Sequence, residues 1–344
     1  MNYESKNSDI FNENKTNNLY YNYSQCQMAD TKEYSIIEKI DKQKLREELS
    51  KLPLINLNKT FQHYINAYKK DFQFLKKFKS ENILKCLDFI NREEEIIIIK
   101  EYADISLLNY LKREEKRGLS SKEIRYIFNQ LNEAIKLFRK HKKIHTCLCS
   151  ENIFLKFKDK GIVTKDYIIK VSDFGCLSKL EIQSKFQLYI KDKIQFIAPE
   201  IFKLKDEEEK NNIDKADLWS LGVLLYFLRF CELPFDNELY KIYKIIPDAK
   251  DPLLTDLLNK LLVLEPNERI SWKDYFNHKF FEITEDEIKE IIEKKKVERE
   301  NLVLQTDEQS QKIGKNGKMT INYNNGDKYE GEFSNNIKEG KGIY

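Results

Sequence analysis

The stretch HTCLCSEN, from His145 to Asn152, holds side chains whose types and spacing could do chemistry. Its thiols Cys147 and Cys149, with Cys176 and His145, could form a metal or redox site. However, structural zinc sites normally place two or more residues between paired cysteines, and here only one intervenes. An accessible reactive thiol is a second alternative. We expect neither and interpret these cysteines as inert.

Five short motifs follow one another in a fixed order along the chain. They are KEYADISLLNYL from Lys100, VSDFG at 171–175, APE at 198–200, DLWSLGV at 217–223 and PNERI at 266–270. Together they resemble a protein kinase domain. One Asp-Phe-Gly triplet would be weak support, whereas five ordered motifs over residues 33–281 make chance a poor explanation.

This resemblance implies an α+β, bilobal fold. A small β-rich N-lobe is expected over residues 33–100 and a larger α-helical C-lobe over residues 104–281. The runs YSII and PLINL suggest strands, residues 61–79 have helical spacing, and EEEIIIIKEY is too apolar for an exposed edge strand. SSKEIRYIFNQLNEAIKLFRKHKK predicts an amphipathic helix opened by a serine cap. WSLGVLLYFLRFC is too short to span a bilayer and predicts a buried core helix.

The resemblance also assigns structural roles to six residues. They are His145, Phe174, Gly175, Glu200, Asp217 and Arg269. Glu200 and Arg269 are expected to form the buried ion pair that fastens the C-lobe. Such a pair is structural and says nothing about catalysis.

The loop that should carry out phosphoryl transfer has lost its charged side chains. In kinases it reads His-Arg-Asp-Leu-x-x-x-Asn, where the Asp accepts the proton of the substrate hydroxyl and the Asn holds magnesium. Here Cys147 stands at the Asp position and Thr146 at the Arg position. Cys149 replaces the lysine that steadies the transferred phosphate. Asn152 and Asp173 keep the two metal-ligand positions.

The phosphate-binding parts of the N-lobe are altered as well. The sequence has no glycine before Gly118, so a glycine-rich loop over the phosphates is missing. The best match to the strand that should carry a phosphate-binding lysine is PLINL, which puts Asn56 at the lysine position. Lys51 and Lys59 are alternatives. The helical glutamate that pairs with this lysine matches Asp71.

By the same resemblance Lys100 is the gatekeeper at the back of the adenine pocket, where an apolar residue or threonine is usual. A buried lysine needs a partner, and we expect Asp71 or Asp173 to provide it. We hypothesise that Lys100, Leu54 and Phe154 fill the nucleotide pocket. Alternatively, Lys100 replaces the missing strand lysine and helps to bind the cofactor.

Three segments flank the kinase-like region. Residues 1–30 are rich in Asn, Tyr, Ser and Lys without a sustained period and predict a disordered polar tail. Residues 282–312 predict a charged helix and linker. Residues 313–344 predict a β-hairpin, and their YEGEF and GKGIY runs resemble a membrane-occupation-and-recognition-nexus (MORN) repeat. That resemblance implies scaffolding near a membrane or the cytoskeleton; a plain glycine-rich hairpin is the alternative.

The composition excludes several classes of protein. Sixty basic and fifty-seven acidic residues leave a net charge of +3, which gives no general affinity for nucleic acid. Six cysteines in 344 residues fit a reducing compartment rather than a disulfide scaffold. The N-terminus lacks an apolar signal region, and no transmembrane segment is expected. We predict a cytoplasmic protein, cortical or cytoskeletal if the tail acts as a MORN unit.

These changes favour a pseudokinase, a catalytically impaired kinase fold that acts through protein partners or allostery. Two alternatives stay open. One is a divergent active Ser/Thr protein kinase that uses ATP, and the other is a pseudokinase that binds Mg-ATP as a structural ligand. The first reading needs no cofactor, whereas the alternatives place Mg-ATP at Asp173, Asn152 and Lys100.

Overall fold

The chain divides into two compact units, residues 1–289 and 290–344. The computed structural model describes residues 3–4, 21–28, 34–50, 56–113, 118–146, 148–157, 167–172, 194–203, 213–235, 246–282, 286, 316–322, 328–334 and 337–343. For residues 3–4, 21–28 and those from 316 onward, the description covers the backbone alone.

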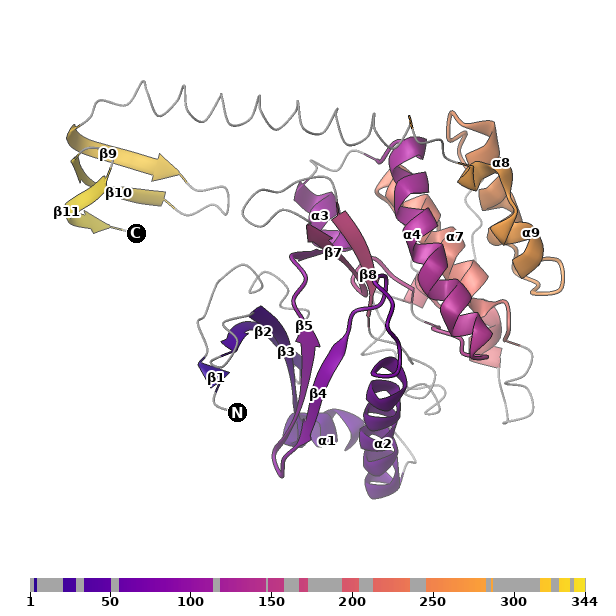
Figure 1. Cartoon of the computed structure of the whole chain (residues 1–344), viewed down its shortest axis with the longest axis horizontal. Coiled ribbons are helices and arrows are strands. Elements are labelled where there is room, and N and C mark those ends of the chain that lie inside the picture. Colours follow the sequence, from indigo (N-terminus) through magenta and orange to yellow (C-terminus); the bar gives the residue numbers. More distant parts are fainter. Residues whose placement is uncertain are drawn as a thin grey trace. The chain divides into compact units, whose positions relative to one another are not determined.

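The N-lobe is built on an antiparallel sheet of five strands in the order β1-β2-β3-β5-β4 (Figure 1). Its strands are β1 (Tyr3–Glu4), β2 (Tyr21–Met28), β3 (Tyr34–Asp41), β4 (Cys86–Asn91) and β5 (Glu95–Glu101). β5 lies between β3 and β4, and Ile96 to Ile99 are buried on both of its faces. This agrees with the prediction that the run is too apolar for an exposed edge strand.

The prediction of a disordered tail is wrong for residues 21–28. These residues form β2, which pairs with β3 from Tyr21↔Ile40 to Gln27↔Tyr34. The abundance of Asn and Ser hid a strand whose tyrosines favour β structure, and only the partner β3 reveals it.

Two helices follow β3 and cover one face of the sheet (Figure 1). They are α1 (Lys42–Ser50) and α2 (Leu57–Leu75). The apolar side of α2, including Phe61 and Tyr64, packs with Ile40 of β3 and with Ile96 and Ile98 of β5. The helix that we expected over residues 61–79 spans Leu57–Leu75, so it begins and ends four residues earlier.

The C-lobe is mainly helical, with one small sheet in the order β6-β7-β8. Its strands are β6 (Ile105–Ser106), β7 (Ile153–Phe157) and β8 (Tyr167–Val171). Its helices are α3 (Leu107–Arg113), α4 (Ser121–Lys140), α7 (Ala216–Phe230), α8 (Pro252–Leu261) and α9 (Trp272–Phe276), with short turns at Ile194–Phe196, Pro199–Lys203 and Lys279–Phe281. Ser120 and Glu123 form a capping box at α4, so the predicted serine cap is present. The structure thus has the predicted α+β fold.

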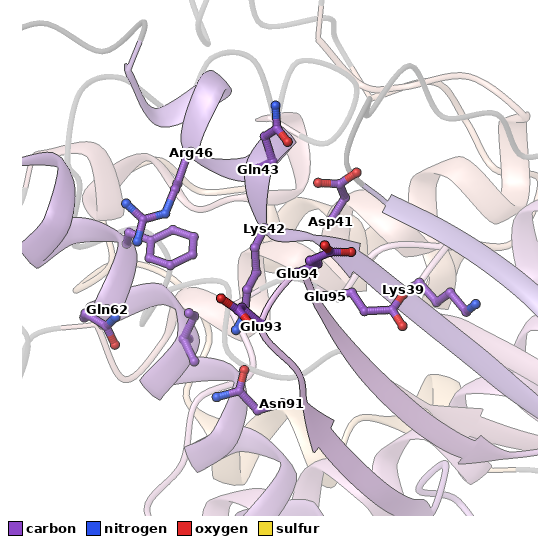
Figure 2. Close-up of a pocket in the computed structure, with 12 residues that line it drawn as sticks. Lys39, Asp41, Lys42, Gln43, Arg46, Gln62, Asn91, Glu93, Glu94 and Glu95 are labelled. Atoms are coloured by element: carbon purple, nitrogen blue, oxygen red, sulfur yellow. The ribbon is translucent and has the colours of Figure 1, made fainter.

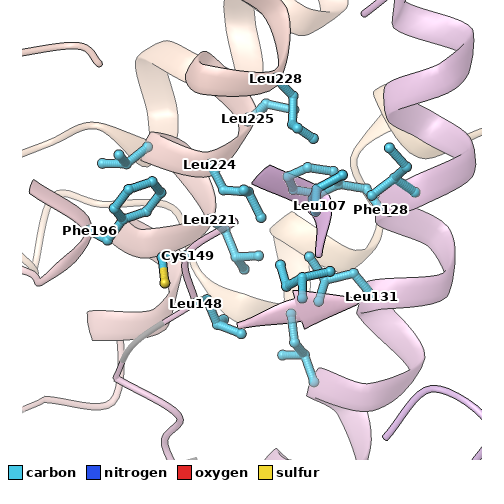
Figure 3. Close-up of a cluster of buried hydrophobic side chains, with 14 of the residues drawn as sticks. Leu107, Phe128, Leu131, Leu148, Cys149, Phe196, Leu221, Leu224, Leu225 and Leu228 are labelled. Carbon is cyan, nitrogen blue, oxygen red and sulfur yellow. The ribbon is translucent and has the colours of Figure 1, made fainter. Parts of the chain in front are cut away.

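The core of the C-lobe forms around α7, which is buried along nearly its whole length (Figure 3). Leu221, Leu224 and Leu228 meet Phe128 of α4 in one apolar cluster. A side chain at Gly222 would approach Leu261 within 2.8 Å, so α7 and α8 pack closely only because this residue is glycine. In the described part of the chain, no helix combines the length and apolarity needed to cross a membrane.

The second unit contains a separate antiparallel sheet. Its strands, in the order β11-β10-β9, are β9 (Asn316–Asn322), β10 (Lys328–Ser334) and β11 (Ile337–Ile343). The predicted hairpin is present as β10 and β11, with Gly331 opposite Gly342. The strand β9 was not predicted.

Candidate functional site

The strand that precedes the N-lobe helices is β3, the central strand of the sheet, which pairs with β5. The resemblance places the phosphate-binding lysine on such a strand. Asn56 is not there: it caps α2, and its side chain accepts a hydrogen bond from the Lys59 backbone N–H at 3.1 Å. The prediction that put Asn56 at the lysine position is therefore wrong, because asparagine there starts a helix. Lys51 and Leu54 lie outside the described residues.

The inward face of β3 carries Ile36, Glu38 and Ile40, since alternate residues of a strand share a face. Ile40 packs toward α2, whereas Ile36 packs with Ala103 and Phe154 near the segment that joins the lobes. Glu38 lies between them and is 1% exposed. By its place on β3, Glu38 matches the position where the family resemblance puts the strand lysine. Sequence reasoning missed it because it matched the later run PLINL, and not YSIIEKI, to that strand.

Lys100 at the end of β5 forms a buried ion pair with Glu38. The Lys100 Nζ and Glu38 Oε2 atoms are 2.8 Å apart, and the two side chains are 5% and 1% exposed. Ile36 pairs directly with Lys100, so Glu38 is its diagonal neighbour on the same face of the sheet. Our prediction had named Asp71 or Asp173 as the partner. Asp71 lies on α2, and Asp173 lies outside the described residues.

Lys100 also contacts the C-lobe. Its Nζ donates to Ser172 Oγ at 3.3 Å, and Ser172 directly precedes Asp173. Among the described residues, neither Glu38 carboxylate oxygen accepts a well-directed hydrogen bond. The Lys100–Glu38 attraction is therefore mainly that of two close charges in a buried place.

An apolar cluster lies beside this ion pair. Ile36, Leu84, Ala103 and Phe154 are 2%, 1%, 0% and 8% exposed. In the family resemblance, adenine would lie among such residues. Phe154 is where the pocket-filling hypothesis placed it, and Ile36 and Leu84 are members that the sequence did not reveal.

The loop that begins at His145 keeps a demanding backbone. Thr146 has a φ of 65°, which is rare for a β-branched residue. The Asp217 carboxylate, in the first turn of α7, accepts the backbone N–H groups of His145 at 2.8 Å and Thr146 at 2.6 Å. Burial raises the pKa of Asp217 to about 6, although these two hydrogen bonds act in the opposite direction. Asp217 has the structural role that we predicted.

The same loop is joined to the end of β8. His145 Nε2 lies 3.0 Å from the Ser172 carbonyl oxygen, and the Asn152 carbonyl accepts the Ser172 N–H at 2.8 Å. Asn152 is 5% exposed. Cys149 is buried in the C-lobe core near Phe196, so its thiol is packed rather than presented (Figure 3).

Four predicted residues cannot be placed in this geometry. Cys147, Asp173, Phe174 and Gly175 lie outside the described residues. In the described part of the chain, no three His, Cys, Asp or Glu side chains are close enough to hold a metal ion.

The predicted C-lobe ion pair is present. Arg269 donates to both carboxylate oxygens of Glu200, at 2.7 and 3.1 Å, and the Arg269 side chain is 0% exposed. Arg269 also donates to the carbonyl oxygens of Lys215 and Val263. This pair fastens the turn at Pro199–Lys203 to the C-lobe.

A cavity of about 750 Å³ lies on the N-lobe, between α1, α2 and the turn that joins β4 to β5 (Figure 2). Basic residues such as Lys39 and Lys42 line it together with acidic residues such as Asp41 and Glu93. Burial and the nearby Arg46 lower the pKa of Lys42, whose ammonium donates to the Arg92 carbonyl. The charges of this cavity largely balance, so it does not select one class of ligand.

Comparison with known proteins agrees with this geometry. The family model described as "Protein kinase domain" matches residues 24–281. The chain is similar to the serine/threonine-protein kinase TIO of Arabidopsis thaliana, with 27% identity over 232 residues, 65% of this chain and 16% of that protein. It is 29% identical to the carbon catabolite-derepressing protein kinase of Candida glabrata over 226 residues, 62% of this chain and 34% of that protein.

A third relative is the dual specificity protein kinase TTK of Mus musculus, 25% identical over 292 residues, which are 76% of this chain and 33% of that protein. The chain thus spans about a third or less of these three relatives. Among solved structures, Rad53 residues 1–466 in complex with AMP-PNP gives a TM-score of 0.56 at 19% identity, covering 76% of this chain and 62% of that one. This likeness shows a shared fold.

Proposed function

Because the chain belongs to the protein kinase family, we propose that it is a kinase domain that acts through binding or allostery instead of phosphoryl transfer. The observation that carries this proposal is the buried Lys100–Glu38 pair on the inward face of the N-lobe sheet. A kinase needs a cation at the strand-lysine position to hold the phosphates of ATP. This chain has a carboxylate there.

A carboxylate in place of the strand lysine opposes nucleotide binding electrostatically. A nucleotide triphosphate would bring negative charge toward Glu38, and Lys100 could turn to the phosphates only by leaving Glu38 buried and unpaired. The apolar cluster around Ile36 and Phe154 adds to this, since its members pack closely on one another where adenine would lie. Cys147 at the predicted base position removes the proton acceptor as well.

Two measurements on the purified chain test the proposal. We expect no transfer of labelled phosphate from Mg-ATP to general Ser/Thr substrates, and no change in melting temperature with ATP, with or without magnesium. Saturating ATP would raise the melting temperature by roughly 5–10 °C if it bound. Phosphate transfer that the Glu38→Lys variant does not increase would contradict the electrostatic reasoning.

A matched pair of variants isolates the charge. In Glu38→Lys with Lys100→Met, a lysine returns to the strand and the gatekeeper becomes apolar. We expect this double variant to gain a magnesium-dependent thermal shift with ATP. Glu47→Gln, at an exposed position on α1, raises the net charge by one as the double variant does; it is the control and should gain none.

The second candidate function is a divergent active kinase, or a domain that binds Mg-ATP as a structural ligand. The contact between Lys100 and Ser172 favours it, because it brings an ammonium group beside the residue that precedes Asp173. The relatives named as protein kinases and the nucleotide analogue in the Rad53 complex support it as well. Phosphate transfer lost in both Lys100→Met and Asp173→Asn would establish an active kinase. A magnesium-dependent shift without transfer would establish the structural ligand.

The proposal extends to the C-terminal sheet. Its YEGEF and GKGIY strands resemble a MORN repeat, and we infer that β9 to β11 help to place a cytoplasmic protein near the cell cortex or cytoskeleton. Fractionation of cells that express the chain with and without residues 313–344 tests this placement. Equal distribution of the two forms would contradict it.

A further inference from the structure

A second cavity, of about 590 Å³, lies where the two lobes meet, away from the Lys100–Glu38 pair. The segment after α2, strand β4 and the end of β5 line it from the N-lobe, and β7 and β8 line it from the C-lobe. Five lysines contribute to its wall: Lys76, Lys79, Lys85, Lys156 and Lys170. Two acidic residues, Glu81 and Glu101, share it, which leaves an excess of three positive charges.

The deepest of these lysines is Lys170 on β8, which is 3% exposed. Its ammonium donates to the Glu81 carbonyl oxygen at 2.9 Å and to Glu101 Oε1 at 2.8 Å. An ammonium group has three N–H donors, so one remains beyond these two bonds. Lys170 is therefore a buried cation in the cavity wall with capacity for a further acceptor.

Glu101 cannot neutralise the site by itself. The same carboxylate lies 3.5 Å from Lys156 Nζ and accepts the Lys85 backbone N–H at 2.9 Å. Burial lowers the pKa of Lys170, and the nearby charges of Lys156 and Lys85 lower it further, against the effect of Glu101. The lysines therefore repel one another across the cavity, and a bound anion would relieve that repulsion.

A structural role explains only part of this cluster. Lys76 and Lys79 follow the C-terminus of α2, where basic side chains interact favourably with the helix dipole. Lys156 lies on β7, Lys170 lies on β8 and Lys85 directly precedes β4, so no helix end accounts for them. Their convergence on one hollow calls for another explanation.

The two sides of the cavity are held together by backbone hydrogen bonds. The Val171 N–H donates to the Asn82 carbonyl at 2.9 Å, and the Leu84 N–H donates to the Val171 carbonyl at 2.8 Å. The Asn82 side chain donates to the Ile169 carbonyl at 3.0 Å. Lysines of both lobes are thereby preorganised around one space.

We propose that this cavity binds a compact soluble anion that carries several phosphate groups. Phosphate oxygens accept hydrogen bonds from several ammonium groups at once, which matches a hollow lined by lysines. A soluble ligand fits better than a lipid headgroup, because the Lys170 ammonium is recessed and a planar bilayer cannot enter the hollow. The ligand would bridge the lobes at a place that does not overlap the nucleotide position.

Calorimetric titration of the full chain with inositol hexakisphosphate tests the proposal. We expect binding that weakens as the salt concentration rises. The variant Lys85→Gln with Lys156→Gln should bind at least about tenfold more weakly. The control Lys273→Gln with Lys279→Gln removes two exposed lysines elsewhere, so net charge is matched, and it should change affinity less than about twofold.

Three results would overturn the proposal: no binding to the wild-type chain, equal loss in the two double variants, or binding only to vesicles that contain a phosphoinositide. If the cavity variant fails to fold, Lys85→Gln alone serves, because the structure gives its exposed side chain no hydrogen bond or ion pair among the described residues. It should still weaken binding several-fold.

Discussion

The two lobes each bury an ion pair, and the two pairs differ in how they are completed. In the C-lobe, Arg269 meets both oxygens of Glu200 and also donates to two backbone carbonyls. In the N-lobe, Lys100 lies 2.8 Å from Glu38, but the carboxylate oxygens accept no well-directed hydrogen bond among the described residues. The first pair is held by directed hydrogen bonds, and the second mainly by the attraction of two opposite charges.

This difference indicates which of the two pairs should tolerate substitution. A buried ion pair with complete hydrogen bonding is hard to replace, because the backbone groups around it depend on it. An incompletely bonded pair is exchanged for apolar residues with little loss, since the cost of burying two charges disappears with them.

The largest effect is expected for Arg269→Met. This change leaves the Glu200 carboxylate without its counter-charge and the Val263 carbonyl without the Arg269 donors, and we expect a loss of roughly 3–5 kcal/mol in the free energy of unfolding. Urea denaturation measures it. Adding Glu200→Leu should recover only part of the loss, because the Val263 carbonyl still lacks the Arg269 donors. Complete recovery would show that the two pairs are alike.

The N-lobe pair should behave differently. Glu38→Leu leaves Lys100 buried without its counter-charge and should cost about 3 kcal/mol. Combining it with Lys100→Met should return stability to within about 1 kcal/mol of wild type. A double variant as unstable as the single one would mean that the pair has directed bonds that we have not recognised.

Asp217 sharpens the comparison, because backbone N–H groups and not a cation hold this buried carboxylate. Its folded-state pKa, raised from 3.8 to about 6, means that the folded chain keeps a proton that the unfolded chain has lost. Its contribution to stability therefore falls as pH rises from about 4 to about 6, by ~3 kcal/mol. Urea denaturation measures the free energy of unfolding of wild type and of Asp217→Asn across this range. As pH rises, the wild type should lose stability relative to the variant. A constant difference would contradict the raised pKa.

The smallest effect is expected where the same chemistry is exposed. Lys260 and Asp256 on α8 are 2.6 Å apart, and both side chains are about half exposed. Lys260→Gln should change the free energy of unfolding by less than about 0.5 kcal/mol, because solvent screens the pair. Thermal unfolding at low and high salt measures it, and a loss near that of Glu38→Leu would remove burial as the explanation.

The fold was predicted well from the sequence because each ordered motif belongs to a particular element of the kinase fold. The core helix α7 and the Glu200–Arg269 pair lie on these motifs, whereas α4 was predicted from its amphipathic spacing and serine cap. Strand β2 was missed because its sequence is rich in polar residues. Only its pairing with β3 reveals it, and neither strand carries one of the family motifs.

The candidate site was predicted only in part. Lys100 was recognised as an unusual buried cation, but Glu38 was not named as its partner, because PLINL and not YSIIEKI was matched to the strand beside it. The signal was present as a charged residue at an alternate position between Ile36 and Ile40 in YSIIEKI. The lysine-lined cavity had no signal in one dimension, since five separated stretches of chain contribute to it.

The positive φ of Thr146 also has a kinetic consequence. This residue can hold its unfavourable backbone only once the Asp217 carboxylate, 71 residues later, is in place to accept its N–H group. The loop therefore acquires its final shape late, after α7 has docked. We expect Asp217→Asn to leave the folding rate nearly unchanged and to make the domain unfold faster, so that this carboxylate determines how long the folded loop persists.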